Sequence, residues 1–255
     1  MKLMKTRVTY RGRFRFPFGF HTGDGRRLGV ADQPLFREED GTVALAGTSL
    51  AGVLRADLLR LQRECDPKTY PPHHLPDCAC VVCELMGPQA REERGTGQEE
   101  PGPRASRVFV AGGRGGAGQE IRVRDHVGID RRSRVAADRR KYDVEVVEGG
   151  VEFPFSLRID DPTEPELRYL EGTLRRLAQG WLFAGGKTGG GLGRAELVEL
   201  ARFDLDLSAA DKLVEHLLAD DPVAGCERQV LLSGGDAAWA ERWELPAAGS
   251  GAGWA

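Results

Sequence analysis

Three cysteines stand close together in DCACVVC, in a chain that contains only five. The possible metal ligands in and before this stretch are Cys65, His73, His74, Cys78, Cys80 and Cys83. The Cys80-x-x-Cys83 spacing allows two thiolates to bind one tetrahedral zinc ion, and Cys78 with His74 would complete the set, with Cys65 or His73 as alternatives to His74. Free thiols in a polar loop are the other interpretation, but crowded surface thiols oxidise readily. Four protein ligands leave no open coordination position, so the sequence predicts a structural zinc ion.

Acidic and basic residues occur together in the loop FHTGDGRRLGVADQPL. Asp24 and Asp32 are the acidic residues, and His21 and Arg26 are among the basic ones. Carboxylates of this kind position metal ions or reacting hydroxyl groups. Ordinary turn chemistry is the alternative, because Asp24 precedes a glycine and Asp32 lies just before Pro34. Composition alone does not decide between the two interpretations.

A third group of residues, LFAGGKTGGGLGRAEL, has glycine at six of the nine positions from Gly185 to Gly193. Gly-Lys-Thr also ends the phosphate-binding loop G-x-x-x-x-G-K-[ST], but the glycine required five residues before Gly186 is Trp181. The context is also reversed, because a helical pattern precedes the glycines and a strand pattern follows them. A flexible turn would need only one glycine. We therefore expect a ligand to approach this backbone closely.

Basic residues are concentrated in RDHVGIDRRSRVAADRRKY. Positions 131 to 141 hold Arg131, Arg132, Arg134, Arg139, Arg140 and Lys141. Such a run is usually a solvated face, but this one has few apolar residues and lies just before a predicted hairpin. The sequence predicts an arm that projects outward, and the charge of the arm suits a phosphate backbone.

The elements that must position these groups follow from periodicity. They are a strand over 8–20, a helix over 48–62, a strand over 107–113, a hairpin over 143–159 closed near Gly149 and Gly150, a helix over 162–183 and a strand over 203–207. This order predicts an α+β, ferredoxin-like βαββαβ core with two helices on one face of an antiparallel sheet. Residues 64–104 form an insertion with little core of its own. Residues 208–255 form a C-terminal extension with a short helix at DKLVEHLL and a disordered end.

Composition limits the functional classes. The chain has 255 residues, of which 40% are hydrophobic, enough for one elaborated domain or two small ones. Its formal net charge of −3 argues against a uniformly basic surface, so a nucleic-acid site must be a local concentration of Lys and Arg. The chain has no apolar run of the roughly 18 residues that span a membrane, and MKLMKTRVTYRGRFRF lacks the apolar stretch of a signal peptide. We expect a cytoplasmic protein without a membrane partner.

Four stretches together resemble the RAMP superfamily of CRISPR effector proteins, in particular the backbone subunit of type III complexes. They are GTSLAGVLR at the start of the first helix, CVVCELMG, VGIDRRSRVA and GGKTGGGLGRAEL. Each stretch alone is a weak match, but the four in this order are specific to the family. The resemblance covers residues 1 to about 207 and implies a ferredoxin-like RNA-recognition core. It also implies a zinc site in 64–104 and a thumb hairpin at about 120–150.

The resemblance also implies a function. The glycine-rich loop would lie against CRISPR RNA, and the residues expected to contact RNA are His21, Arg26, Ser49, Arg55, Arg131, Arg132, Arg134, Lys187, Thr188, Gly189 and Gly190. Asp32, in VADQP, matches the catalytic aspartate of cleaving members, and Asp24 lies off that pattern. The implied reaction is cleavage of target RNA by the adjacent 2′-OH, with a divalent metal such as Mg²⁺. The implied partners are CRISPR RNA, single-stranded target RNA, copies of this chain and other type III effector subunits.

Two alternatives stay open. A sibling subunit would cap or scaffold the same complex without cutting RNA, and the presence of Asp32 favours the cleaving form. A zinc-containing RNA-binding protein that acts alone is a third possibility, which monomeric behaviour with guide RNA would support.

Overall fold

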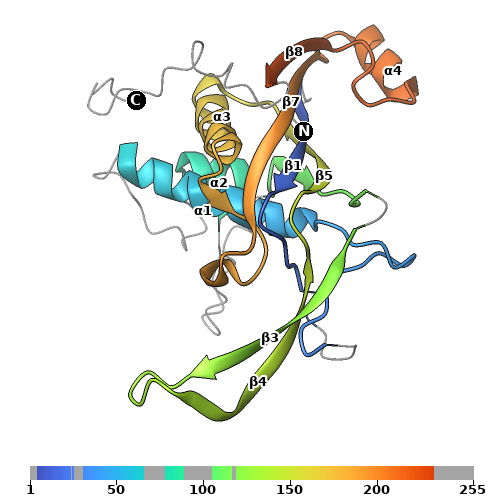
Figure 1. Cartoon of the computed structure of the whole chain (residues 1–255). Helices are drawn as coiled ribbons and strands as arrows, with labels where there is room; N and C mark the ends of the chain where they lie inside the picture. Colours follow the sequence, from blue (N-terminus) through green and yellow to red (C-terminus); the bar gives the residue numbers. More distant parts are fainter. Residues whose placement is uncertain are drawn as a thin grey trace, which may run out of the picture.

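A computed structural model describes residues 5–23, 25, 31–65, 78–88, 105–116 and 119–232. Its main element is an antiparallel sheet with the strand order β2-β5-β1-β7-β6, in which β8 also pairs with β7. The strands are β1 (Thr6–Phe16), β2 (Val108–Ala111), β5 (Val151–Asp160), β6 (Leu182–Phe183), β7 (Arg194–Asp206) and β8 (Glu227–Leu232). The sheet curls around its helices (Figure 1).

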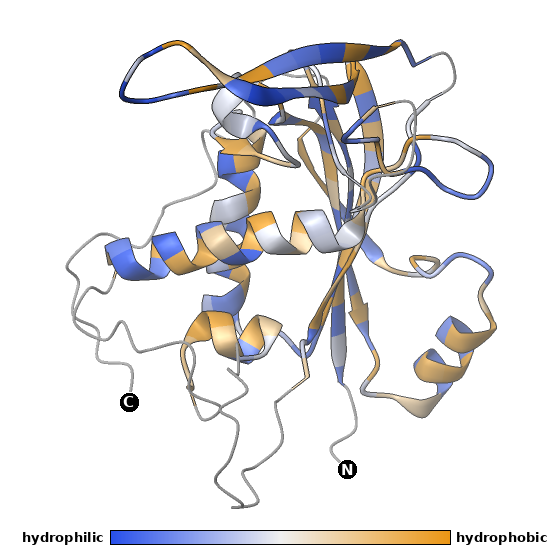
Figure 2. Ribbon diagram, turned by 90° about the horizontal axis from the view of Figure 1, so that it is seen from below, coloured by the Kyte–Doolittle hydropathy of each residue, from blue (hydrophilic) through white to orange (hydrophobic). Residues whose placement is uncertain are grey.

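Helices α1 (Gly47–Cys65) and α3 (Glu164–Ala178) cover one face of this sheet (Figure 2). The short helix α2 (Val81–Met86) packs beside them. The core is built by alternation on β1, where Tyr10 and Phe14 are buried, and by the apolar stripe of α1, where Leu54 and Leu58 are buried. The order β1, α1, β2, β5, α3, β7 is the predicted βαββαβ order, so the mixed α+β architecture is compatible with a ferredoxin-like fold.

The opposite face of β1 carries arginines that are paired with acidic residues of neighbouring segments. Arg13 binds Glu199 at 2.7 Å and Arg15 binds Glu196 at 3.0 Å, both on β7. Arg11 binds Asp221 at 2.7 Å, in the turn that follows helix α4 (Ala210–Leu218). This ladder of ion pairs neutralises the face of the sheet that the helices leave open. Figure 2 shows α4 on the side of the strands away from α1.

Strands β3 (Ile121–Ile129) and β4 (Ala136–Val147) form a separate two-stranded hairpin that projects from the body (Figure 1). The hairpin predicted across Gly149 and Gly150 is therefore wrong, because β4 pairs with β3 while β5 pairs with β1 and β2. The chain changes sheets at these glycines. A Cβ atom at Gly149 would lie 2.2 Å from the carbonyl oxygen of Pro17, and Gly150 has φ +92°. Only glycine fits this crossing around the end of β1.

Strand β1 and helix α3 both end earlier than their hydrophobic patterns in the sequence predict. β1 ends at Phe16, so Phe18 is 59% exposed, and Phe20 regains a buried place by bridging Val147. Helix α3 ends at Ala178, and Trp181, predicted on its apolar face, is 59% exposed beyond it. In both places a turn interrupts a periodic pattern that continues in the sequence.

The predicted helix at DKLVEHLL is confirmed as α4, and β8 extends the sheet beyond residue 208. The predicted disordered end, 233–255, lies outside the described residues. Residues 66–77 and 89–104, most of the predicted insertion, also lie outside them. Among the described helices, none has both the length and the apolar character needed to cross a membrane.

Candidate functional site

Asp32 lies on a short segment that runs beside the base of the hairpin. Gln33 forms a parallel bridge with Val144 of β4, and its backbone N–H donates to the carbonyl of Asp143 at 3.0 Å. The Asp32 side chain is exposed, and its Oδ2 accepts a hydrogen bond from the backbone N–H of Asp143 at 3.1 Å. The hairpin, rather than the main sheet, therefore positions this carboxylate.

A cavity of about 580 Å³ opens beside Asp32. Its lining residues are His21, Gly23, Gly25, Asp32, Gln33, Pro34 and Tyr142. The aspartate shares this space with an imidazole and a phenol, which are groups that exchange protons with substrates. Asp24 and Arg26, from the same loop, lie outside the described residues.

His21 is only 3% exposed although it was predicted to contact RNA. Its Nδ1 lies 2.7 Å from the carbonyl oxygen of Glu145, and a carbonyl only accepts, so Nδ1 carries the proton. Burial lowers the pKa of His21, and the charge of Lys187 acts in the same direction, while the bond to Glu145 opposes them. The ring is therefore neutral near pH 7, with Nε2 as an acceptor. His21 lines the cavity as a fixed, uncharged group.

A further carboxylate, Asp143, lies near Asp32 and interacts with Asp125 of β3, and sequence reasoning missed both. Asp125 and Asp143 are directly opposite one another in the β3–β4 register. A hydrogen bond between them raises the pKa of Asp143, with a smaller contribution from the charge of Asp32. Lys141, 3.0 Å from Asp125, lowers the pKa of Asp125. The pairing of strands brings these acids together, and only the hairpin register would have revealed them.

The glycine-rich loop divides into two functional parts. A Cβ atom at Gly185 would lie 2.2 Å from the carbonyl oxygen of His21, and the N–H of Gly186 donates to that oxygen at 2.7 Å. Gly185 and Gly186 are therefore needed for packing within the protein. At Gly189 and Gly190 a Cβ atom would meet nothing within 4 Å. The exposed part of the loop, around Thr188, is therefore open to a ligand.

A second cavity, of about 620 Å³, adjoins the first at Gly23. Its lining residues are Thr22, Gly23, Ser49, Gly52, Val53, Ala56, Asp57, Arg60, Leu182, Phe183, Gly185 and Gly186. The start of α1, the first glycines of the glycine-rich loop and the segment around Gly23 thus border this second cavity. Of the residues predicted to contact RNA, Ser49 lies in it, whereas Arg55 donates to the carbonyl of Met86 and links α1 to α2.

The predicted basic arm forms the free end of the hairpin (Figure 1). Arg131, Arg132 and Arg134 are exposed there, in a turn held by Asp130, whose Oδ1 accepts from the N–H of Arg132 at 3.0 Å. Arg134 has φ +60° in this turn. The three arginines lie at the tip, whereas Asp32 lies at the base.

Cys78, Cys80 and Cys83 place their Sγ atoms within 4.8 Å of one another. Tetrahedral zinc with bonds of about 2.3 Å holds thiolates at similar separations, so the donor set fits zinc. Burial raises the pKa of the Cys80 and Cys83 thiols, and a bound cation would reverse this effect. Cys65 is not part of the cluster, and His73 and His74 lie outside the described residues. Among the described residues, no comparable group of three ligands surrounds Asp32.

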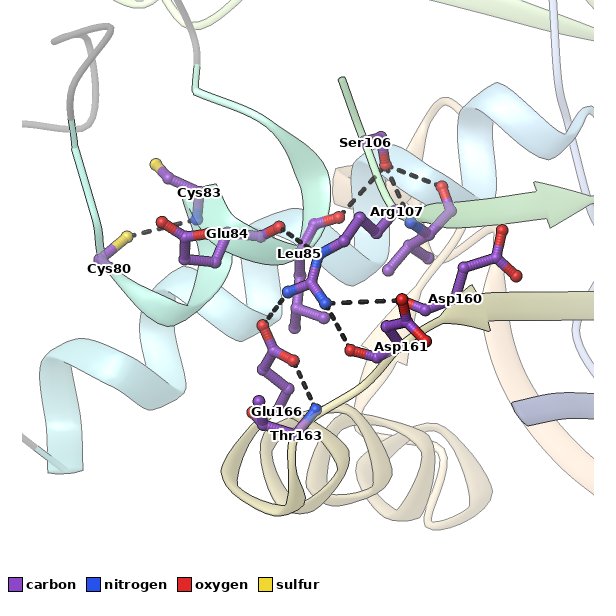
Figure 3. Close-up of polar contacts among 11 residues, drawn as sticks. Cys80, Cys83, Glu84, Leu85, Ser106, Arg107, Asp160, Asp161, Thr163 and Glu166 are labelled. Carbon is purple, nitrogen blue, oxygen red and sulfur yellow. Dashed lines mark hydrogen bonds and ion pairs between the residues drawn. The ribbon is translucent and has the colours of Figure 1, made fainter. Parts of the chain in front are cut away.

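Arg107 connects the cysteine cluster to the core (Figure 3). Its Nε donates to the carbonyl of Glu84 in α2 at 3.2 Å, and Nη1 donates to the carbonyl of Asp161 at 2.8 Å. Nη2 pairs with Glu166, whose other oxygen accepts from the N–H of Thr163 and completes the capping box of α3. Helix α2, which contains Cys83 and is capped by Cys80, is thereby fixed to α3 and to the end of β5.

Comparison with known proteins identifies the family of this chain. The model of the RAMP superfamily matches residues 19–196, which is more than half of the chain, and the chain belongs to that superfamily. A similar protein is the CRISPR system Cms endoribonuclease Csm3 of Methanocaldococcus jannaschii, which is 32% identical over 92 residues. The match covers 33% of this chain and 36% of Csm3, so the chain spans about a third of the length of that relative.

Proposed function

We propose that this chain is a backbone subunit of a type III CRISPR ribonucleoprotein that binds CRISPR RNA and cleaves complementary target RNA. The observation that carries the proposal is the exposed carboxylate of Asp32 in a cavity that adjoins, at Gly23, a second cavity lined by Gly185 and Gly186 of the glycine-rich loop. Membership of the RAMP superfamily supports RNA binding, and the likeness to a CRISPR endoribonuclease supports cleavage.

RNA binding rests on the backbone and on local positive charge. The open space around Gly189 and Gly190 allows a phosphate to approach the backbone of this loop closely, and Lys187 adds a charge beside them. Ser49 lines the second cavity. These contacts recognise phosphates and shape, so sequence is read by pairing between guide and target.

Cleavage rests on Asp32, which would orient a 2′-OH for attack on the neighbouring phosphate or hold the divalent ion. Such an ion, for example Mg²⁺, would stabilise the charge that develops on the phosphate. The bond from the N–H of Asp143 fixes one carboxylate oxygen and leaves the other for the substrate. Nε2 of the neutral His21 ring is a hydrogen-bond acceptor in the same cavity. The cysteine cluster would hold a structural zinc ion, away from this chemistry.

A second candidate is a subunit of the same complex that scaffolds RNA without cutting it. The observation in its favour is that the described acids around Asp32 do not form a group of three ligand atoms. A cleaving subunit would then need the RNA phosphate or a neighbouring copy to complete the coordination of the ion.

A target-RNA cleavage assay on the assembled complex separates the two. We expect Asp32→Ala to abolish cutting while assembly and target binding persist. Glu39→Ala is the matched control, an exposed acid in the same segment that lies outside the lining of both cavities, and it should cut normally. Products should carry a cyclic phosphate, and chelation of metal should stop the reaction. Full activity of Asp32→Ala would assign the chain to the scaffold class.

A further inference from the structure

Glu145 is a buried acid at the base of the hairpin, only 8% exposed, in a place that no motif marks. Its Oε2 accepts from the backbone N–H of Leu35 at 2.9 Å, a contact between residues 110 positions apart. Nη2 of Arg37 lies 3.1 Å and 3.2 Å from its two oxygens. The carboxylate is therefore shared between two residues that closely follow Asp32.

The backbone of Glu145 contacts the same region from the other side. Its N–H donates to the carbonyl of Gln33 at 3.1 Å, and its carbonyl oxygen accepts from Nδ1 of His21 at 2.7 Å. One residue of β4 thus contacts both segments that line the cavity beside Asp32. The bonds between Arg37 and the Glu145 carboxylate are charge-assisted, and in a site shielded from water such bonds are stronger than hydrogen bonds between neutral groups.

We infer that Glu145 is a positioning residue for Asp32: its carboxylate holds the Asp32 segment against the hairpin. Asp32 itself has one described hydrogen bond to the hairpin, from the N–H of Asp143. Its place in the cavity therefore depends on the residues after it, and the Leu35 and Arg37 contacts fix those residues to β4. The part of the inference that concerns cleavage rests on the proposed function, and the part that concerns the segment does not.

Two substitutions of Glu145 remove its side-chain contacts in part and in full. Glu145→Gln keeps an oxygen that accepts from Leu35 but loses the charge that binds Arg37. Glu145→Leu loses both contacts while retaining similar volume, and Arg37, with 33% of its side chain exposed, remains able to reach water. Glu148→Gln is the matched control, because Glu148 lies one residue beyond β4 and pairs with Arg124 of the hairpin at 2.8 Å. Arg37→Met tests the same contact from the partner and serves if Glu145→Leu does not fold.

The first readout is hydrogen exchange on the full chain, which needs no RNA and no activity. We expect the Gln33 and Leu35 amides to exchange at least about tenfold faster in Glu145→Leu, with Glu145→Gln intermediate and Glu148→Gln unchanged. Amides of the β1–β5 pair should keep their protection in every variant. Equal exchange at Gln33 and Leu35 in wild type and Glu145→Leu would overturn the inference.

The second readout is target-RNA cleavage by the assembled complex. In Glu145→Leu the kcat should fall about tenfold while KM stays within about twofold, because the RNA-contacting surface is retained. A rise in KM with unchanged kcat would also overturn the positioning role. If the wild-type complex does not cut at all, the proposed cleavage fails, and the exchange measurement still decides whether Glu145 holds the segment.

Discussion

The ammonium group of Lys187 lies 4.4 Å from the centre of the Tyr142 ring. The lysine belongs to the glycine-rich loop and the tyrosine to β4, where it lines the Asp32 cavity, so this cation–π contact joins the loop to the hairpin. The Tyr142 ring also stacks on His126 of β3, with the ring centres 5.4 Å apart. The lysine is thereby held against the hairpin.

Replacement of Lys187 by methionine should weaken binding of guide RNA and make its salt dependence shallower. Each phosphate contact that is lost lowers the slope of log K against log salt by about one. Fluorescence titrations at several salt concentrations would measure both effects. Tyr142→Leu is the control, because it removes the cation–π contact and leaves the charge. A slope unchanged in Lys187→Met would mean that this lysine contacts no phosphate.

Two glycine substitutions should behave in opposite ways. Gly190→Val has open space around it, so the free protein should keep its melting temperature while RNA binding falls through loss of close approach. Gly185→Ala should destabilise the free protein, because Gly185 has φ +88° and lies against the carbonyl of His21. Thermal melts without RNA and binding assays with RNA distinguish the two effects. Normal RNA binding by Gly190→Val would place the ligand elsewhere.

The cysteine cluster should contain about one zinc ion per chain, measured by elemental analysis of purified protein. Cys83→Ser should lose the ion and most of the thermal stability of the protein, since Cys83 is almost fully buried and its helix is fixed to α3 through Arg107. Cys226→Ser, a change outside the cluster, should retain the ion. A well-folded wild-type protein without zinc would contradict the assignment.

Acid should destabilise the protein through His21. Its pKa is lowered in the folded state relative to the value of about 6.5 in an unfolded chain. The unfolded state therefore binds the proton first, so the stability that His21 contributes is complete above pH 6.5 or so and is lost as pH falls toward the folded-state pKa. Urea denaturation between pH 7.5 and 5.5 measures this loss. His21→Asn, which still offers a donor to Glu145, should show a flatter profile, and an identical profile would refute the assignment.

Local patterns in the sequence were sufficient to predict much of the architecture. The alternation of β1 and the stripes of α1 and α3 predicted the βαββαβ order, and the cysteine spacing predicted a cluster of Cys78, Cys80 and Cys83 that is confirmed as a possible metal site. These features depend on neighbours in the chain. Periodicity reports such neighbours directly.

Long-range contacts account for what the sequence did not predict. The change of sheets at Gly149 depends on how closely Pro17 approaches, and the pairing of Asp125 with Asp143, the neighbour of Asp32, depends on the register of a hairpin. Arg55 is the last residue of GTSLAGVLR and was expected to contact RNA, yet it donates to the carbonyl of Met86. Periodicity carries no information about these contacts, because each joins residues far apart in sequence.

The ion-pair ladder on the open face of β1 has a consequence for how RNA reaches this protein. Arg11, Arg13 and Arg15 each form an ion pair with an acidic residue, so this face exerts little long-range electrostatic attraction on a polyanion. Arg131, Arg132 and Arg134 at the hairpin tip form no ion pair within the described part of the chain. In a chain of net charge −3, we therefore expect the proposed RNA ligand to be steered first to the tip of the hairpin. Diffusional capture there would align the strand along the hairpin before it meets the glycines.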